Sequence, residues 1–375
     1  MIGQEHAPGP GDARVCRVAL NLVLAHRRKL ATGILSRFPD PVRALAARPQ
    51  DLSGLGLTRE DALSLLPPDL FERGRREIET CRALGIDLVT FEDEAYPPLL
   101  REIFDPPLVL YVRGKPEVLS AASLAIVGAR RPTAYGKIMA ERLGREAAGA
   151  GLVVVSGLAF GIDTRSHWGA LETGRTVAVL GSGLDVLYPP SNRDLADKIA
   201  EEGAVISEFP LGTNPLGFHF PLRNRIISGL SLAVVVVEAG LRSGSLITAK
   251  LALEQDREVL AVPGNATSAL SAGTNWLIAS GARLVGRWDD VWEGLPDHVR
   301  AFLAPRDPGR PARLPALGPQ EARVMALLKP DALTSVDEIV EATDLSVSET
   351  LSVLLGLELK AAVLQGPGQK YMRRC

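Results

Sequence analysis

The sequence predicts an α/β protein: a doubly wound, Rossmann-like parallel sheet flanked by a small helical N-terminal domain and a C-terminal winged-helix domain. Between residues 86 and 290, short continuous apolar runs alternate with stretches of helical periodicity, which is typical of parallel sheets covered on both faces. The runs of strand length are 124–127, 152–155, 176–180, 204–206, 232–237 and 259–262. The helical periods lie at 136–149, 163–173, 191–202 and 245–256.

Residues 1–84 are predicted to form the small helical domain, of the SAM or helix-hairpin-helix type. Apolar residues recur there at helical spacing, and prolines such as Pro39, Pro41 and Pro49 divide the region into short helices. Two glycines in the segment Gly54-Leu55-Gly56 precede a helix capped at Thr58. This pattern fits either a helix-hairpin-helix turn that holds a phosphate or an ordinary tight turn between packed helices.

The sheet domain is predicted to span residues 85–300, and a linker rich in Pro, Arg and Ala follows at 301–318. Residues 319–375 have three helical periods, at 320–328, 335–342 and 346–359, and then two short apolar segments around a Gly366-Pro367-Gly368 turn. Three helices followed by a hairpin predict a winged helix.

Composition limits the class of protein. The chain has 375 residues, 23% of them charged, and a formal net charge of −2, so any polyanion must meet a local basic surface. Residues 113–146 supply one, with seven Lys or Arg and three acids. The three cysteines lie far apart, and we expect a reduced, cytoplasmic protein. No apolar run reaches bilayer length and no secretory signal is evident, so we expect no membrane partner.

Glycine or serine follows nearly every predicted strand. The strand ends read VGAR, VSGLAFGID, LGSGLD, SEFPLG, VEAGLRSGS and VPGN. In an open parallel sheet these ends share one edge, where ligands bind. Glycine allows a ligand to approach the main chain, and helix N-termini direct free N–H groups at it. The sequence therefore predicts a crevice for an extended anion that carries phosphates.

Catalytic motifs are weak. Gly181-Ser182-Gly183 lacks the third glycine of a dinucleotide fingerprint, and the sequence contains no Walker A motif. Ser156, Asp163 and His167 suggest a hydrolase, but Ser156 does not lie in a nucleophile elbow. We interpret Asp163 as a helix cap and His167 as a structural side chain. No cluster has metal spacing, so we expect no metal, no cofactor and no catalysis.

Four segments supply candidate ligand contacts. Arg130 follows the first strand at the binding edge. In a helix starting at Pro221, Arg223 falls on the apolar stripe and Arg225 opposite it, so Arg223 needs an anionic partner, either an internal acid or the ligand. Phe218 and Phe220 have the rings to stack bases or to pack in the core. Ser243-Gly244-Ser245 and Thr248 open a helix, where they either bind an anion or only cap it.

The region from Ala125 to Val285 resembles the DNA-processing protein A family, DprA or Smf. The resemblance rests on long segments such as IVGARRPTAYG, VSGLAFGIDTRSHWGAL, FPLRNRIISGLS and VVVVEAGLRSGSLITAKLALEQDREVLAVPG. It implies a homodimeric, non-enzymatic protein that binds single-stranded DNA and helps to load the RecA recombinase onto it in natural transformation.

By position, the resemblance implies that Arg130 grips phosphate. The turns at Gly128, Ser156-Gly157 and Gly181-Ser182-Gly183 would line the pocket, and Arg223, Asn224 and Arg225 would flank the strand near Phe220. One departure is Gly128-Ala129-Arg130, where the family usually has Gly-Ser-Arg. The change removes a hydroxyl donor but keeps the arginine.

The C-terminal module is acidic: residues 331–358 carry seven acids and no Lys or Arg. Its third helix holds Glu349 and Glu358, which would repel phosphates, so we expect it not to read duplex DNA. A protein-binding or dimer-supporting role is the expectation there.

An alternative function for the whole chain is a nucleotide-processing enzyme, such as a nucleoside-monophosphate phosphoribohydrolase. Such enzymes have Pro-Gly-Gly-x-Gly-Thr and then a catalytic glutamate, whereas this chain reads Pro263-Gly264-Asn265-Ala266-Thr267.

Overall fold

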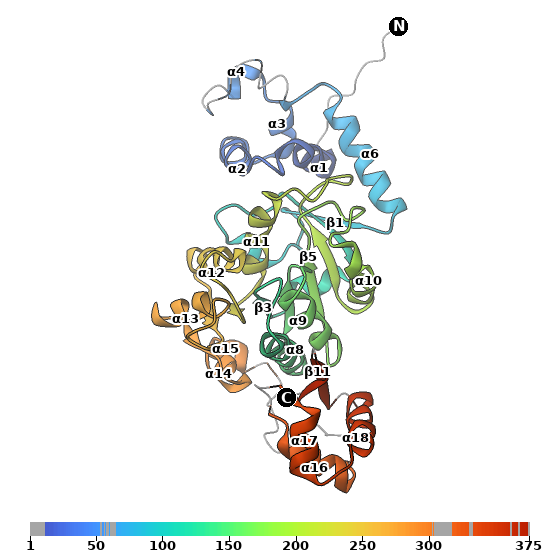
Figure 1. Ribbon diagram of the computed structural model, residues 1–375. Helices are drawn as coiled ribbons and strands as arrows, with labels where there is room; N and C mark the ends of the chain where they lie inside the picture. Colours follow the sequence, from blue (N-terminus) through green and yellow to red (C-terminus); the bar gives the residue numbers. More distant parts are fainter. Residues whose placement is uncertain are drawn as a thin grey trace.

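The computed structural model describes residues 12–52, 55, 57, 60, 65–301, 303, 317–329, 333–360, 362–366 and 368–373. Its first part is helical (Figure 1). The helices are α1 (Ala13–Leu24), α2 (Arg28–Arg37), α3 (Pro41–Leu45), α4 (Pro49–Leu52) and α6 (Leu70–Ala83). Val18, Leu20 and Leu24 of α1 are buried, and α6 approaches α1 closely because Gly74 lacks a side chain where Ala19 lies. The predicted turn at Gly54 and Gly56, with its cap Thr58, lies outside the described residues.

The centre of the protein is a sheet in which nine described strands lie in the order β1-β2-β6-β5-β4-β3-β7-β8-β9. Neighbours from β6 to β9 pair in parallel, as predicted, whereas β1 pairs with β2 and β2 with β6 in antiparallel fashion. The sequence pattern did not reveal β1, β2 or β9. The bounds are β1 Asp87–Thr90, β2 Val109–Gly114, β3 Ser123–Val127, β4 Val153–Ser156, β5 Thr176–Val179, β6 Ala204–Ser207, β7 Ala233–Val236, β8 Glu258–Ala261 and β9 Arg283–Leu284.

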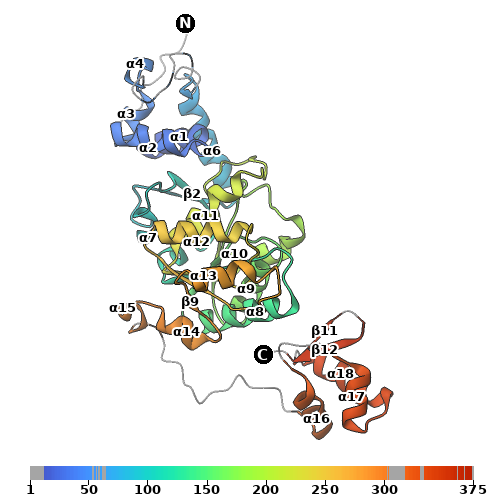
Figure 2. The same cartoon turned by 60° about the vertical axis from the view of Figure 1, so that its left-hand side comes forward.

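Helices cover both faces of this sheet, as a doubly wound fold requires. Leu124 and Ile126 of β3 pack against α8 on one face, and Ala125 and Val127 belong to the core beneath α11 and α12 on the other. Figure 2 shows α11 and α12 side by side on the second face. The helices are α7 (Pro98–Arg101), α8 (Ala134–Gly149), α9 (Ile162–Leu171), α10 (Arg193–Glu202), α11 (His219–Leu230), α12 (Gly244–Glu254), α13 (Ala272–Ala279), α14 (Trp288–Glu293) and α15 (Asp297–Arg300).

The C-terminal part is a winged helix, as predicted. Val324, Ile339 and Leu354, one from each of its helices, are buried together in its core. Its strands form a small antiparallel sheet in the order β10-β12-β11. The elements are α16 (Pro319–Leu327), β10 (Thr334–Ser335), α17 (Val336–Thr343), α18 (Val347–Leu359), β11 (Val363–Gly366) and β12 (Lys370–Arg373). Most of the predicted linker at 301–318 lies outside the described residues.

No helix among the described residues combines the length and apolarity that crossing a membrane demands. The same residues contain no group of three or more His, Cys, Asp or Glu side chains arranged to hold a metal ion.

Candidate nucleic-acid interface

A cavity opens at the carboxyl edge of the sheet, where the chain order reverses. β3 lies between β4 and β7, so the loops that follow β3 and β7 leave the sheet in opposite directions. Such a topological switch point is where open α/β sheets bind ligands. The cavity has a volume of ≈ 480 Å³. We call it the switch-point cavity. Nine of the predicted contact residues line it: Gly128, Arg130, Phe220, Arg223, Asn224, Ser243, Gly244, Ser245 and Thr248.

Arg130 owes its position to a tight turn after β3. The amide of Ala129 donates to the carbonyl of Glu238, 2.7 Å away, and the carbonyl of Ala129 accepts from the amide of Ile162 at 3.1 Å. Gly161 has a φ of +82°, and a Cβ there would lie 2.4 Å from the oxygen of Ala129. Only glycine fits this approach. Arg130 is exposed, and its guanidinium lies over the ring of Phe220.

Glu238, which follows β7, fixes the same turn from the other side. Its carboxylate accepts from the amide of Thr133 at 2.8 Å and from the hydroxyl of Thr133 at 2.6 Å. The hydroxyl oxygen of Thr133 in turn accepts from the amide of Gly136 and caps α8. Glu238 is 3% exposed, so its charge is held by this turn and does not face the cavity mouth. The two loops at the switch point are thereby joined.

Arg223 forms the floor of the cavity. Its side chain is buried and donates to the carbonyls of Gly157, at 2.9 Å, and of Val179. Burial lowers its pKa to about 10, against the opposing attraction of Asp163, so it stays charged at neutral pH. The sequence left open whether its anionic partner is an internal acid or the ligand; in the structure the guanidinium donates to main-chain carbonyls, and the nearby carboxylate of Asp163 favours its charge.

Asp163 lines the cavity beside Arg223. Its carboxylate accepts from the amides of Gly157, at 3.1 Å, and Ala159, at 3.4 Å. Burial raises its pKa to about 6, although Arg223 and the two amides favour the charged form. Asp163 does not cap α9 as predicted. It is the second residue of the helix, and the N-cap position is Gly161. The carboxylate instead holds the loop that follows β4.

The hydrolase hypothesis fails on geometry. The hydroxyl of Ser156 donates to the carbonyl of Ile126 at 2.6 Å, and His167 Nδ1 bonds to the hydroxyl of Thr176 at 2.7 Å. Burial lowers the pKa of His167 to about 3, so the ring is neutral. Ser156 therefore joins β4 to β3 and His167 joins α9 to β5, and they do not form a nucleophile and base with Asp163.

Arg225 is buried, contrary to the prediction that it lies opposite the apolar side of its helix. Its guanidinium donates to both oxygens of Glu208 at 2.6 Å and lies 3.2 Å from the carboxylate of Asp105. These partners cover the side of α11 that a helical wheel leaves to solvent. Arg225 does not line the switch-point cavity.

Five further predicted residues also lie outside the cavity lining: Ser156, Gly157, Gly181, Ser182 and Gly183. The hydroxyl of Ser182 donates to the carbonyl of Val186 at 2.7 Å, and Gly181 lies against the ring of Phe220. The structure places these residues behind the lining, where they support it.

The opening of α12 meets α11 across the cavity. The hydroxyl of Ser243 accepts from the amide of Ser245 and lies 2.8 Å from the hydroxyl of Ser245. Asn224 donates to the carbonyl of Gly244 at 3.4 Å. Hydroxyls, an amide and a helix start thus face two guanidinium groups, which suits an anionic ligand.

Some lining residues were not predicted. Ala159, Gly217 and Pro221 line the cavity, as do Ile227 and Ile247. Gly217 lies in the loop before α11, where no periodic signal identifies it, and Pro221 lies in the first turn of α11. Asp163 was identified in the sequence, and its position in the first turn after a glycine-rich strand end is a usable signal.

Comparison with known proteins gives two family matches. The model of DNA recombination-mediator protein A matches residues 87–296, and that of the DprA winged helix domain matches residues 308–369. The chain is 43% identical to the DNA processing protein DprA of Bacillus subtilis, over 61% of this chain and 78% of that protein. It is 40% identical to the protein Smf of Escherichia coli, over 75% of this chain and 76% of that protein.

Two solved structures are also similar. The X-ray structure of DprA from Streptococcus pneumoniae has a TM-score of 0.63 and 34% identity, covering 76% of this chain and 98% of that one. A structure of DNA processing protein A from Helicobacter pylori, described for its single-stranded DNA binding mode, has a TM-score of 0.50 and 33% identity, covering 55% of this chain and 94% of that one.

Proposed function

Because the chain belongs to the DNA recombination-mediator protein A family, DprA or Smf, we propose that it is a sequence-independent single-stranded DNA-binding protein that acts as a recombination mediator. In this role it loads RecA recombinase onto incoming single strands during natural transformation. It acts as a cytoplasmic homodimer, without a cofactor and without catalysing a reaction.

The observation that carries the proposal is the position of Arg130. This arginine is exposed at the mouth of the switch-point cavity, and Arg223 lies at its floor. Hydroxyls of Ser243 and Thr248 complete a lining that suits phosphate oxygens. A lining of this kind predicts binding that depends on the backbone and not on the sequence. The Helicobacter pylori relative described for single-stranded DNA binding supports the same proposal.

We also propose that the chain divides into residues 1–84, 85–300 and 319–375, with 301–318 as the connection. The start of β1 at Asp87 and of α16 at Pro319 supports these divisions.

The test is a titration of fluorescent oligonucleotides, single-stranded and duplex, at two salt concentrations. We expect single strands to bind more tightly, with each phosphate contact adding about −0.7 to the slope of log K against log salt. Equal affinity for duplex, or a slope near zero, would overturn the proposal. Release of base from AMP, measured by chromatography, would favour the phosphoribohydrolase alternative.

A second assay addresses the mediator role. RecA filaments are assembled on strands already coated by a single-strand-binding protein, with and without this protein. We expect the wild type to accelerate assembly of the RecA filaments and Arg130→Ala not to accelerate it. The control is Arg131→Ala, because Arg131 is the adjacent exposed arginine and does not line the cavity. If the wild type binds strands but accelerates nothing, the mediator role is wrong while the binding proposal stands.

A further inference from the structure

A second cavity lies where α2 approaches the start of α11. It has a volume of ≈ 640 Å³ and lies between the N-terminal helices and the sheet domain. We call it the α2 groove. Its lining includes Arg27, Arg28, Lys29, Phe104, Asp105 and Leu222.

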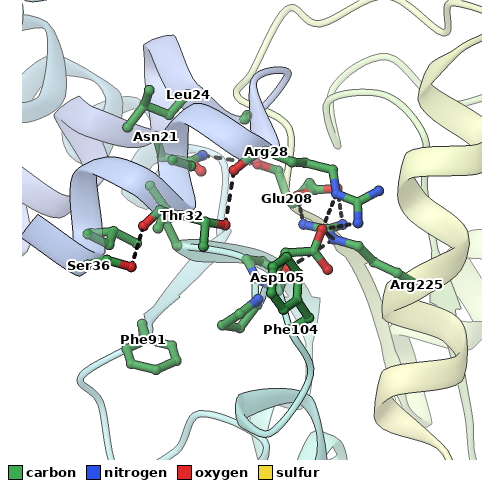
Figure 3. A pocket seen from close by; sticks show the side chains of 16 residues that line it. Asn21, Leu24, Arg28, Thr32, Ser36, Phe91, Phe104, Asp105, Glu208 and Arg225 are labelled. Carbon is green, nitrogen blue, oxygen red and sulfur yellow. Dashed lines mark hydrogen bonds and ion pairs between the residues drawn. The ribbon is translucent and has the colours of Figure 1, made fainter. Parts of the chain in front are cut away.

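The groove carries an excess of positive charge. Three of its lining residues are cations and one is a carboxylate. Arg28 pairs with Asp105, and Asp105 also lies 3.2 Å from Arg225 (Figure 3). Arg27 and Lys29 are exposed, and neither forms an ion pair with any residue that the structure describes. These two charges are therefore available to an anion from outside.

Phe104 adds an aromatic face to the same groove. It is 87% exposed, which is unusual for a phenylalanine. The loop that carries it is anchored, because its neighbours Ile103 and Asp105 are buried. Figure 3 shows Phe104 beside Asp105, next to the ion pairs of Arg28 and Arg225. A fixed, exposed ring among unpaired cations is the combination with which single-strand binders hold a base and its phosphates.

The groove and the switch-point cavity share one helix. Phe220 and Asn224 of α11 line the cavity, and Leu222, between them in sequence, lines the groove. The two spaces therefore lie on different sides of the first turns of α11, about 10–12 Å apart across a helix with its side chains. Phe218, just before this helix, is 57% exposed. A flexible strand can cross that distance without leaving the surface.

We propose that a single strand of nucleic acid held in the switch-point cavity continues over the start of α11 into the α2 groove, where Arg27 and Lys29 contact phosphates and Phe104 stacks on a base. The inference rests on the proposed function and extends the binding site onto the N-terminal helices. An acidic peptide would use the two cations but has no need of an exposed ring. The exposed ring therefore favours nucleic acid as the ligand.

The test uses the full chain and two oligothymidylates, of about 5 and about 20 nucleotides, one near the lower limit of the site sizes of single-strand binders and one above their upper limit. The variants are Phe104→Ala, Phe104→Tyr and the double variant Arg27→Ala with Lys29→Ala. All three side chains are exposed, so the substitutions leave the core intact. Arg37→Ala is the matched control, because Arg37 is an exposed arginine of α2 that does not line the groove.

We expect Phe104→Ala to weaken binding of the long strand roughly fivefold to a hundredfold, as loss of one stacked base does, and to leave the short strand unchanged. Phe104→Tyr should retain the affinity. The double variant should make the salt slope of the long strand less negative by about 1.4, for two lost phosphate contacts.

The outcomes separate this inference from the proposed function. Unchanged binding of the long strand by Phe104→Ala and by the double variant, together with weaker binding of both strands by Arg130→Ala, would overturn the α2 groove alone. If Arg130→Ala also changes nothing, the switch-point cavity itself is not the site. If Arg37→Ala weakens binding of the long strand equally, the effect reflects the overall charge of the protein and not the groove. That result would also overturn the inference.

Discussion

The guanidinium of Arg130 lies over the ring of Phe220, with its Cζ 5.2 Å from the ring centroid. Arg223 approaches the same ring at 6.0 Å. The sequence left open whether Phe220 stacks a base or packs in the core, and in this structure its ring supports two arginines. A cation–π contact of this kind limits the motion of an exposed arginine. Arg130 is thus held at the cavity mouth before a ligand binds.

We expect Arg130→Ala to weaken binding to all single strands alike and to make the salt slope less negative by about 0.7, because one phosphate contact is lost. Arg130→Lys should recover part of the affinity, since it keeps the charge but not the planar contact with Phe220. Fluorescence titration at several salt concentrations measures both quantities. An unchanged slope for Arg130→Ala would count against the site.

Binding should strengthen at mildly acidic pH. Burial raises the pKa of Asp163 to about 6 from 3.8, so the folded protein binds this proton more tightly than the unfolded chain does. Ionisation of this carboxylate therefore destabilises the folded protein above pH 6. The destabilisation diminishes as pH falls through that value. Protonation also removes a negative charge beside Arg223. We expect about fivefold tighter binding of single strands below pH 6, the effect of one unit charge at close range in water.

The matched variant is Asp163→Asn, which keeps an oxygen to accept from the amides of Gly157 and Ala159. It should bind at neutral pH as tightly as the wild type does at low pH, and the pH dependence should disappear. If Asp163→Asn retains the pH dependence of the wild type, then another group titrates.

The turn at Gly161 can be tested by adding one methyl group. Gly161→Ala should lower the free energy of unfolding by at least about 1–3 kcal/mol, because a left-handed φ of +82° is strained for alanine. The close carbonyl of Ala129 adds to this cost and displaces Arg130. Gly244→Ala is the control within the same site, since nothing lies within 4 Å of its added Cβ. Denaturant titration measures the free energy of unfolding of both variants. Equal stability of the two would contradict the role of Gly161 in this turn.

Arg225 should contribute to the stability of the folded protein and not to DNA binding. Arg225→Ala leaves the buried carboxylate of Glu208 without its partner, and we expect a loss of about 3–5 kcal/mol in the free energy of unfolding. Replacing both residues by Met should recover much of that loss. The folded fraction of Arg225→Ala should bind single strands with wild-type affinity. A specific loss of binding without loss of stability would return Arg225 to the ligand site.

The winged helix should not read duplex DNA through α18. Glu349 closes a capping box with Ser346, and Leu351, Leu355 and Leu359 are exposed along the same helix. An acidic and apolar helix is unsuited to a groove lined by phosphates. A chain ending near residue 303 should therefore bind duplex DNA no more weakly than the whole chain does. Tight duplex binding at about 150 mM salt that requires residues 319–375 would refute this.

The parallel sheet was predictable, though not the order of its strands, because continuous apolar runs and helical periods alternate there. β2 escaped prediction although Val109–Val112 is a plain apolar run, since an antiparallel strand next to the edge strand β1 does not belong to that alternation. The predicted strand bounds differ from the observed ones by one residue at most places, as at β4 and β7.

The candidate site was predictable where strand ends fixed it and not where distant parts of the chain meet. The loops after β3 and β7 supplied lining residues as expected. The position of Arg225 depended on Asp105 and Glu208, which a helical wheel cannot include. The exposure of Phe104 likewise reflects how the loop before β2 packs, and no local pattern encodes it.

Arg223 and Arg225 stand two residues apart on α11, one in the switch-point cavity and the other in the ion pairs that join the N-terminal helices to the sheet. Turning this helix would break both sets of bonds at once. The surface that receives the ligand is therefore rigid before binding, and the protein loses little conformational entropy when a ligand binds. A rigid surface of this kind favours a ligand that can adapt its own shape, and a single strand does so more readily than a stiff double helix.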